Sequence, residues 1–191
     1  MTKTNKKARR TQAERRAETQ TRLLSVAREL FGRHGYTDTS IEDIATQCDL
    51  TVRPIYHYFG SKLGLFEAVT KQIEHDIVKN IEGRINATPE DIWSGFMKNC
   101  EDPIFRQIIL IDGPILLGRS RMANGAITQA AKGRSADVME RRPDGLTMSL
   151  LFGALSSAAL YIAENGASPD DYNKIKALID FHSNKTQSDR T

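Results

Sequence analysis

Apolar residues recur at intervals of three and four along most of this 191-residue chain, and Gly or Pro separates one such segment from the next. This period places the apolar side chains on one face of an α-helix, whereas the strict alternation of a half-buried strand is scarce. The spacing therefore predicts an all-α protein. The first helix is expected over residues 11–34, with Gly35 in the left-handed position that ends many helices.

Two short helices are expected next. Either Thr39 or Ser40 opens the first of them, because each is followed three residues later by an acidic residue, as in a capping box. After a break at residues 49–51, Thr51 is expected to N-cap the second short helix. Pro54 would then be its third residue, where a missing N–H costs no hydrogen bond.

A longer helix is expected from Ser61 to about residue 83, and it can connect two domains. Beyond it the pattern predicts about five more helices. Their breaks are expected at residues 102–103, 112–114, 143–145 and 165–169. Residues 118–142 carry three glycines within a weak helical pattern, which predicts a broken or mobile helix there.

The charge of the chain is divided unevenly. Residues 1–62 hold 12 Lys and Arg against 7 Asp and Glu, whereas residues 63–191 hold 15 against 17. Seven of the basic residues lie within residues 1–16, a self-repelling composition that predicts a flexible arm. Such an arm can bind nucleic acid, because each phosphate that it neutralises releases counterions. A solvated tail without a partner explains the basic composition equally well. Glu14 and Glu18 argue against a mitochondrial transit peptide.

The cysteine content and the absence of known catalytic motifs predict a cytoplasmic protein. No catalytic residue, cofactor or metal site is expected. Cys48 and Cys100 lack the spacing of a disulfide framework or a zinc module. Cys48 is expected to be a small core residue, with a redox sensor as the alternative. The sequence contains no P-loop, GxGxxG, GxSxG or HExxH motif.

The longest uncharged stretch covers residues 146–163, which is 18 residues and near the shortest length that spans a membrane. Its Ser and Thr residues favour a helix buried in protein, so no membrane is expected as a partner. Small residues spaced by four let another helix approach closely, which indicates packing between subunits. The predicted dimer interface consists of Leu150, Gly153, Ala154, Ser157, Ala158, Tyr161, Ile175 and Leu178.

A short helix, a tight turn and a second short helix form a helix-turn-helix, whose second helix enters the major groove of DNA. At 100° per residue, Ile55, Tyr58 and Phe59 share the packing face of that helix. The outward face carries Arg53, Tyr56 and His57. A guanidinium can pair with two acceptors of guanine, and the other two groups can reach phosphates or base edges. The alternative is a three-helix bundle whose exposed polar residues are incidental.

These residues resemble the DNA-binding domain of the TetR (tetracycline repressor) family of bacterial regulators. The resemblance rests on residues 39–45 (TSIEDIA), Thr51, residues 55–59 (IYHYF), Ser61 and Lys62. It implies an all-helical homodimer with a variable C-terminal effector domain and a dimer contact made by the last two long helices. By position, it implies that Thr51, Arg53, Tyr56 and His57 are contacts of the recognition helix. It also implies that Thr39 and Lys62 contact phosphates at helix N-termini, which favour anions in any protein.

Two departures from the family pattern affect the DNA-binding segment. Asp49 stands in the turn where the family commonly has Gly, and Asp adopts the left-handed region less readily. Arg53 and Pro54 stand where small residues are common. Arg53 therefore predicts a base preference particular to this protein, with guanine the expected base.

An apolar effector pocket is expected in the helical body, where residues 112–118 (DGPILLG) also resemble a segment of some regulators of this family. The predicted lining residues are Trp93, Phe96, Met97, Phe105, Ile109, Asp112, Leu116, Arg121 and Met122. Asp112 or Arg121 would be the polar anchor for the effector. The alternative, favoured for any single one of these residues, is that it belongs to the core.

The sequence thus predicts a flexible arm over residues 1–16, a helix-turn-helix domain over 17–62, a helical effector-binding and dimerisation domain over 63–185, and a tail over 186–191. The predicted function is that of a homodimeric transcription regulator, a ligand-responsive repressor that binds a palindromic double-stranded DNA operator and a small-molecule effector. One alternative is a DNA-bound structural or cell-division factor without an effector. The other is a small helical enzyme whose helix-turn-helix is incidental.

Overall fold

The computed structural model describes residues 11–82, 98–127, 129, 145–166, 168, 170–171, 173–175 and 177. They form α1 (Gln12–His34), α2 (Ile41–Gln47), α3 (Arg53–Phe59), α4 (Lys62–Glu82), α6 (Pro103–Phe105), the π-helix η1 (Arg106–Asp112), α7 (Gly113–Leu116), α8 (Arg119–Ala123) and α10 (Gly145–Asn165). This part of the chain has no strand, which confirms the predicted all-α fold. None of the helices within it is long and apolar enough to cross a membrane.

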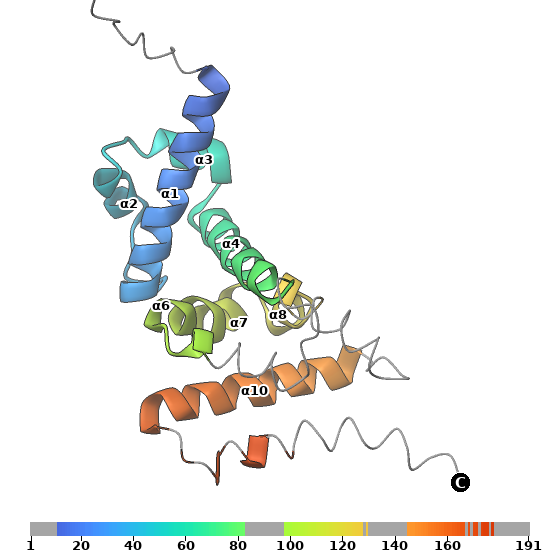
Figure 1. Ribbon diagram of the computed structural model, residues 1–191. Coiled ribbons are helices and arrows are strands. Elements are labelled where there is room, and N and C mark those ends of the chain that lie inside the picture. Colours follow the sequence, from blue (N-terminus) through green and yellow to red (C-terminus); the bar gives the residue numbers. More distant parts are fainter. Residues whose placement is uncertain are drawn as a thin grey trace, which may run out of the picture.

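One hydrophobic core runs from the helix-turn-helix domain into the body. Apolar residues spaced by three and four are buried in it from α1 (Leu23, Ala27, Phe31), α2 (Ile41, Ile44, Ala45) and α4 (Leu65, Val69, Ile73), so the helical period of the sequence is confirmed there. From the body, the core takes in Phe105, Ile108, Ile109 and Met122. α6 and η1 pack against α1, and α10 crosses the body on the side away from α2 and α3 (Figure 1). The helix-turn-helix domain is therefore joined to the body by packing as well as by the chain.

Polar side chains fix where α2 and α4 begin. Ser40, not Thr39, caps α2: its hydroxyl accepts a hydrogen bond from the Asp43 N–H, and the Asp43 carboxylate accepts one from the Ser40 N–H. Ser61 Oγ accepts a hydrogen bond from the Gly64 N–H at 3.0 Å, as predicted for the start of α4.

α3 begins later than the sequence predicted. Its N-cap is Val52 and no side chain caps it, so the assignment of Thr51 as the N-cap is wrong. An N-cap oxygen bonds to the N–H two or three residues later, and the third residue after Thr51 is Pro54, which has no N–H. With α3 starting at Arg53, the proline lies in the first turn, where its missing N–H has no partner to lose.

Three residues of the helix-turn-helix domain have positive φ, namely Gly35, Asp49 and Gly60, and the first two shape the turns on either side of α2. Gly35 ends α1 with a φ of 77°, as predicted. Asp49 has a φ of 52° in the turn between α2 and α3. This is the left-handed conformation that glycine adopts without steric cost, so Asp49 keeps the geometry of the turn at some expense in backbone strain.

The predicted break at residues 112–114 is absent, because η1 continues into α7 with helical dihedral angles at Gly113. The Gly113 N–H donates to the carbonyl oxygen of Ile108, five residues earlier, which is π-helical spacing. This wider turn shifts the hydrogen-bond register just before Pro114, whose ring would interrupt an α-helical ladder. The helix stops instead near Gly118, with a φ of 88°, and the short α8 that follows confirms a broken helix. Residues 128 and 130–142 of that predicted segment lie outside the described residues.

Burial makes both thiols unreactive. Cys48 and Cys100 are buried, and burial raises the pKa of each, to about 12 for Cys100. Because the thiolate is the reactive form, we expect iodoacetamide at mildly alkaline pH to leave the native protein unmodified and to modify both cysteines in guanidinium chloride. Intact-mass spectrometry measures the number of labels. Native-state labelling of Cys48 would instead favour the redox-sensor alternative.

Candidate nucleic-acid interface

α3 presents three polar side chains to solvent. Arg53, Tyr56 and His57 are exposed, and Tyr56 is 49% accessible. The opposite face, formed by Ile55, Tyr58 and Phe59, packs in or against the core. The two faces are those that the 100° spacing predicts. Outward-facing guanidinium, phenol and imidazole groups can all donate hydrogen bonds to phosphates or base edges.

A close approach between α3 and α4 fixes the direction of this outward face. Gly64 lies in the first turn of α4, and a Cβ at this position would overlap the carbonyl oxygen of Phe59 at the end of α3. Any other residue would push the two helices apart. The sequence therefore sets the angle of α3 through packing against α4, in addition to the short connection at Gly60.

The first turns of α3 and α4 carry cations and no acidic residue, which is the reverse of what stabilises a helix. The N-terminus of a helix has a partial positive charge, so acids are favourable there and cations are not. α2 follows the rule with Glu42 and Asp43, whereas α3 begins with Arg53 and α4 with Lys62. A phosphate placed near these two cations would offset the unfavourable charge, so the arrangement favours an anionic partner.

Lys62 is held in a defined position. Its Nζ lies 4.2 Å from the centre of the Tyr36 ring, in a cation–π contact, and donates to the carbonyl oxygen of Thr37 at 3.5 Å. Lys62 remains partly exposed, so the ammonium group can also reach a phosphate. The sequence analysis missed Tyr36, because the contact joins two segments that are far apart in the chain and no local pattern marks it.

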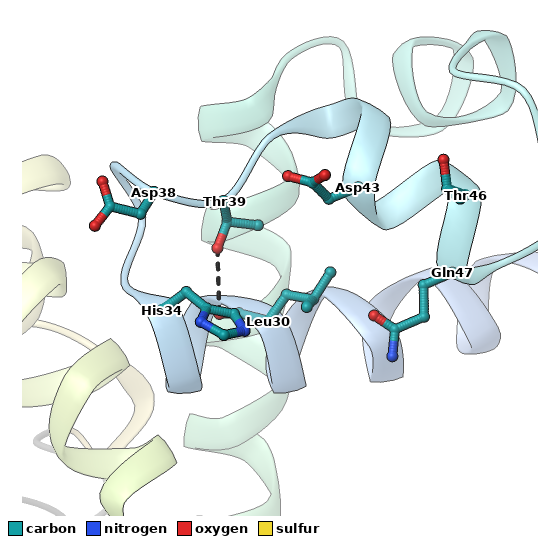
Figure 2. Close-up of a pocket in the computed structure, with 7 residues that line it drawn as sticks. All are labelled: Leu30, His34, Asp38, Thr39, Asp43, Thr46 and Gln47. Carbon is teal, nitrogen blue, oxygen red and sulfur yellow. Dashed lines mark hydrogen bonds between the residues drawn. The ribbon is translucent and has the colours of Figure 1, made fainter.

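The structure removes Thr39 from the predicted phosphate contacts. The residue is 2% exposed, and its hydroxyl lies 2.8 Å from the Gly35 carbonyl oxygen and 3.2 Å from that of Leu30. Both acceptors belong to the end of α1, and Figure 2 shows the hydroxyl pointing toward that helix. Thr39 therefore ties the loop before α2 to α1 and does not present its oxygen to solvent.

Thr39 also lines a groove of about 480 Å³ between α1 and α2 (Figure 2). The other lining residues are Leu30, His34, Asp38, Asp43, Thr46 and Gln47. Hydrogen bonds from Ser40 hold the pKa of Asp43 below its usual value and so stabilise its ionised carboxylate. With Asp38 beside it, this groove disfavours phosphate. The candidate DNA contacts are therefore the exposed Thr51, Arg53, Tyr56 and His57, together with Lys62.

Several residues predicted to line an effector pocket are core residues. Phe105, Ile109 and Met122 are buried, and Leu116 packs against them. The core alternative fits these four residues better than a pocket lining. Trp93, Phe96 and Met97 lie outside the described residues.

Both predicted polar anchors already have partners. Asp112 Oδ2 accepts a hydrogen bond from the Tyr36 N–H at 2.9 Å, and the Arg121 guanidinium donates to the Glu74 carboxylate at 2.5 Å. Glu74 is buried on α4, so an effector that took Arg121 would leave a buried carboxylate unpaired. Neither residue is a free anchor. The sequence analysis missed Glu74. This acidic residue lies three positions before the buried Ile77 and therefore on the same face of α4, which was a signal for a buried ion pair.

A hollow of about 440 Å³ lies between α1, α4 and α6. Its lining residues are Arg28, Ile73, Asp76, Ile77, Lys79, Asn99, Asp102 and Phe105. Arg28 and Asp76 form an ion pair at 3.5 Å within this lining. The mixture of charges differs from the apolar pocket that the sequence predicted.

The predicted dimer residues of α10 lie mainly on one exposed face. Leu150 is 61% exposed, Tyr161 is 57% exposed, and Ala154 and Ser157 are exposed between them. Steps of four, three and four residues place these positions in one row along the helix. Gly153 and Ala158 are half-buried, Ile175 is buried, and Leu178 lies outside the described residues. The exposed row has the spacing and small residues that helix packing between subunits requires.

Comparisons with known proteins agree with this geometry. Residues 23–69 match the family model of bacterial regulatory proteins of the tetR family, and residues 91–181 match a tetracycline-repressor-like C-terminal domain. MftR from Mycobacterium tuberculosis, named for the regulation of mycofactocin biosynthesis, is 36% identical over 75 residues, which are 37% of each chain. The HTH-type transcriptional regulator UidR from Escherichia coli is 37% identical over 54 residues, which are 28% of each chain.

The match thus covers 37% of the length of MftR and 28% of the length of UidR. The likeness to a solved structure extends much further. A TetR-family transcriptional regulator from Pectobacterium atrosepticum has a TM-score of 0.55 and 28% sequence identity, over 90% of this chain and 95% of that one. Two models of the TetR family match successive parts of the chain. One covers the N-terminal helix-turn-helix domain and the other covers the C-terminal body. The protein is therefore a member of the TetR family.

Proposed function

We propose that this protein is a transcription regulator that binds double-stranded DNA as a homodimer and acts as a ligand-responsive repressor. The observation that carries the proposal is the outward face of α3, with Arg53, Tyr56 and His57 exposed and with cations in place of acids at the starts of α3 and α4. Its matches to DNA-binding regulators add support. The protein acts in the cytoplasm and has no catalytic role.

In this proposal, a two-fold dimer places one α3 in each of two successive major grooves of a palindromic operator. Arg53 reads guanine through its guanidinium, and Thr51, Tyr56 and His57 contact base edges or phosphates. Lys62 binds a backbone phosphate, which fixes the orientation of the domain without reading sequence.

Regulators of this family act as dimers with small-molecule effectors. We infer that an effector bound in the body of this protein favours a subunit arrangement in which the two copies of α3 no longer match the operator. The effector can do so only if it binds that arrangement more tightly than the DNA-bound one. A bound ligand that left operator affinity unchanged would contradict this part of the proposal.

Fluorescence anisotropy tests the DNA-binding proposal directly. The protein is titrated onto DNA from upstream of its own gene and onto a scrambled duplex, at low and at near-physiological salt. We expect a specificity ratio of ~10³ or more that survives the higher salt. Equal binding to both duplexes that is lost with salt would favour the structural-factor alternative, and no binding would favour the enzyme.

The exposed row on α10 gives a test of the dimer. Leu150→Glu is expected to raise the dimer dissociation constant by ~100-fold or more, because a dimer packed on this row would bury two carboxylates. Light scattering after size-exclusion chromatography measures the oligomeric state. Ile115→Glu is the matched control, since Ile115 is a 76% exposed apolar residue on α7, outside the predicted interface. A Leu150→Glu variant that remains as dimeric as the control would place the subunit contact elsewhere.

A further inference from the structure

A hydrogen bond joins the body to the turn that follows α1. Oδ2 of Asp112, the last residue of η1, accepts it from the backbone N–H of Tyr36 at 2.9 Å, across 76 positions of the sequence. The packing around this bond is close. A Cβ at Gly35 would lie 3.3 Å from the amide nitrogen of Gln107 and 3.8 Å from Asp112 Oδ2. One side chain of η1, Asp112, therefore fixes the backbone of the turn, and a second, Gln107, lies close to Gly35.

The same turn holds the ammonium group of Lys62. The Lys62 Nζ lies over the Tyr36 ring at 4.2 Å from its centre and donates to the Thr37 carbonyl oxygen at 3.5 Å. The Tyr36 ring is itself packed edge-on against Phe66, with 5.4 Å between the ring centres. Two successive residues of one turn thus contact Lys62, and the backbone of the first is bonded to Asp112.

We propose that Asp112 is a positioning residue for DNA binding: it holds the turn so that Tyr36 and Thr37 orient the Lys62 ammonium group toward a backbone phosphate. The inference rests on the proposed function, in which Lys62 binds a phosphate. Asp112 does not touch the DNA. Its negative charge, taken alone, opposes the binding of a polyanion, so removing that charge should strengthen binding. A positioning role predicts the opposite effect.

The first measurement compares wild type with Asp112→Ala on the operator, by anisotropy over a range of salt concentrations. Two phosphate contacts per dimer depend on Asp112 in this proposal. Their complete loss would weaken binding by roughly 30-fold at ~0.15 M salt and lower the slope of log K against log salt by about 1.8. We expect Asp112→Ala to move part or all of this way. Unchanged or tighter binding with an unchanged slope would overturn the inference.

A double-mutant cycle then tests whether Asp112 acts through Lys62. The double variant Asp112→Ala, Lys62→Gln is expected to bind no more weakly than Lys62→Gln alone, because the contact that Asp112 positions is already gone. Additive losses would mean that Asp112→Ala disturbs the fold in general, and would overturn the inference.

Two further variants separate positioning from charge and from folding. Asp112→Asn keeps an oxygen that can accept the Tyr36 N–H, so we expect it to retain the salt slope of the wild type. Glu101→Ala removes the same charge from an exposed residue of the body and is expected to leave the slope unchanged. Loss of slope in Asp112→Asn equal to that in Asp112→Ala would also overturn the inference. Wild-type protein without sequence-specific binding would overturn the proposed function itself.

Discussion

Substituting Arg53 by alanine is expected to remove the preference of this protein for one base pair in each operator half-site. Arg53 is the first residue of α3, its side chain is exposed, and it forms no ion pair with any described residue. A guanidinium that donates to O6 and N7 of guanine discriminates against other bases by ~1–3 kcal/mol. A two-fold dimer makes this contact twice, so changing both half-sites together should cost the wild type about 2–6 kcal/mol.

The measurement is competition anisotropy with a series of operators in which each base pair of the half-site is replaced symmetrically. Wild type should show a sharp loss at the pair that Arg53 reads, and Arg53→Ala should show none at that pair while keeping its preferences at the others. Arg33→Ala is the control for charge, because Arg33 is an exposed residue of α1 that pairs with Glu29. Uniformly weaker binding of Arg53→Ala to every operator would mean that Arg53 contacts the DNA backbone and reads no base.

The features that the sequence predicted well depend on spacing within a single helix. The positions of Arg53 and Ile55 on opposite faces of α3 follow from the helical period alone, and the structure has them exposed and buried as expected. The same holds for Leu65 and Ile73 of α4, which are both buried. Burial of one helix face needs no knowledge of which element covers it, so periodicity is a sufficient guide.

The features that the sequence did not predict depend on contacts between distant segments. Thr39 and Ser40 both have capping-box spacing, and only the carbonyl oxygens at the end of α1 decide that Thr39 turns inward. Asp112 was predicted as a polar anchor for an effector within residues 112–118, and its partner in the structure is the N–H of Tyr36, on the other side of the junction between the domains. Such pairings arise when α1 packs against η1, and no local pattern records them.

Substituting Arg121 by methionine is expected to lower the free energy of unfolding by about 3–5 kcal/mol. The guanidinium of Arg121 donates to Glu74, whose side chain is only 4% exposed. Gly125 closes over the same carboxylate, since a Cβ at this position would overlap Glu74 Oε1. Methionine nearly preserves the apolar stem of Arg121 and removes its charge. The variant thus leaves a buried carboxylate without its cation, and water has little access to replace it.

Removing the carboxylate, in Glu74→Leu, should lower the free energy of unfolding by less than Arg121→Met does, because the two partners are not equally buried. Arg121 is 25% exposed, so the guanidinium left behind in Glu74→Leu can be hydrated. The double variant Glu74→Leu, Arg121→Met replaces the pair with apolar side chains and should recover most of the loss. Lys174→Met, which breaks the exposed pair with Asp170, is the control and should cost less than ~0.5 kcal/mol. Urea unfolding followed by circular dichroism measures all four variants. A double variant no more stable than Arg121→Met would mean that lost packing, and not the unpaired carboxylate, causes the destabilisation.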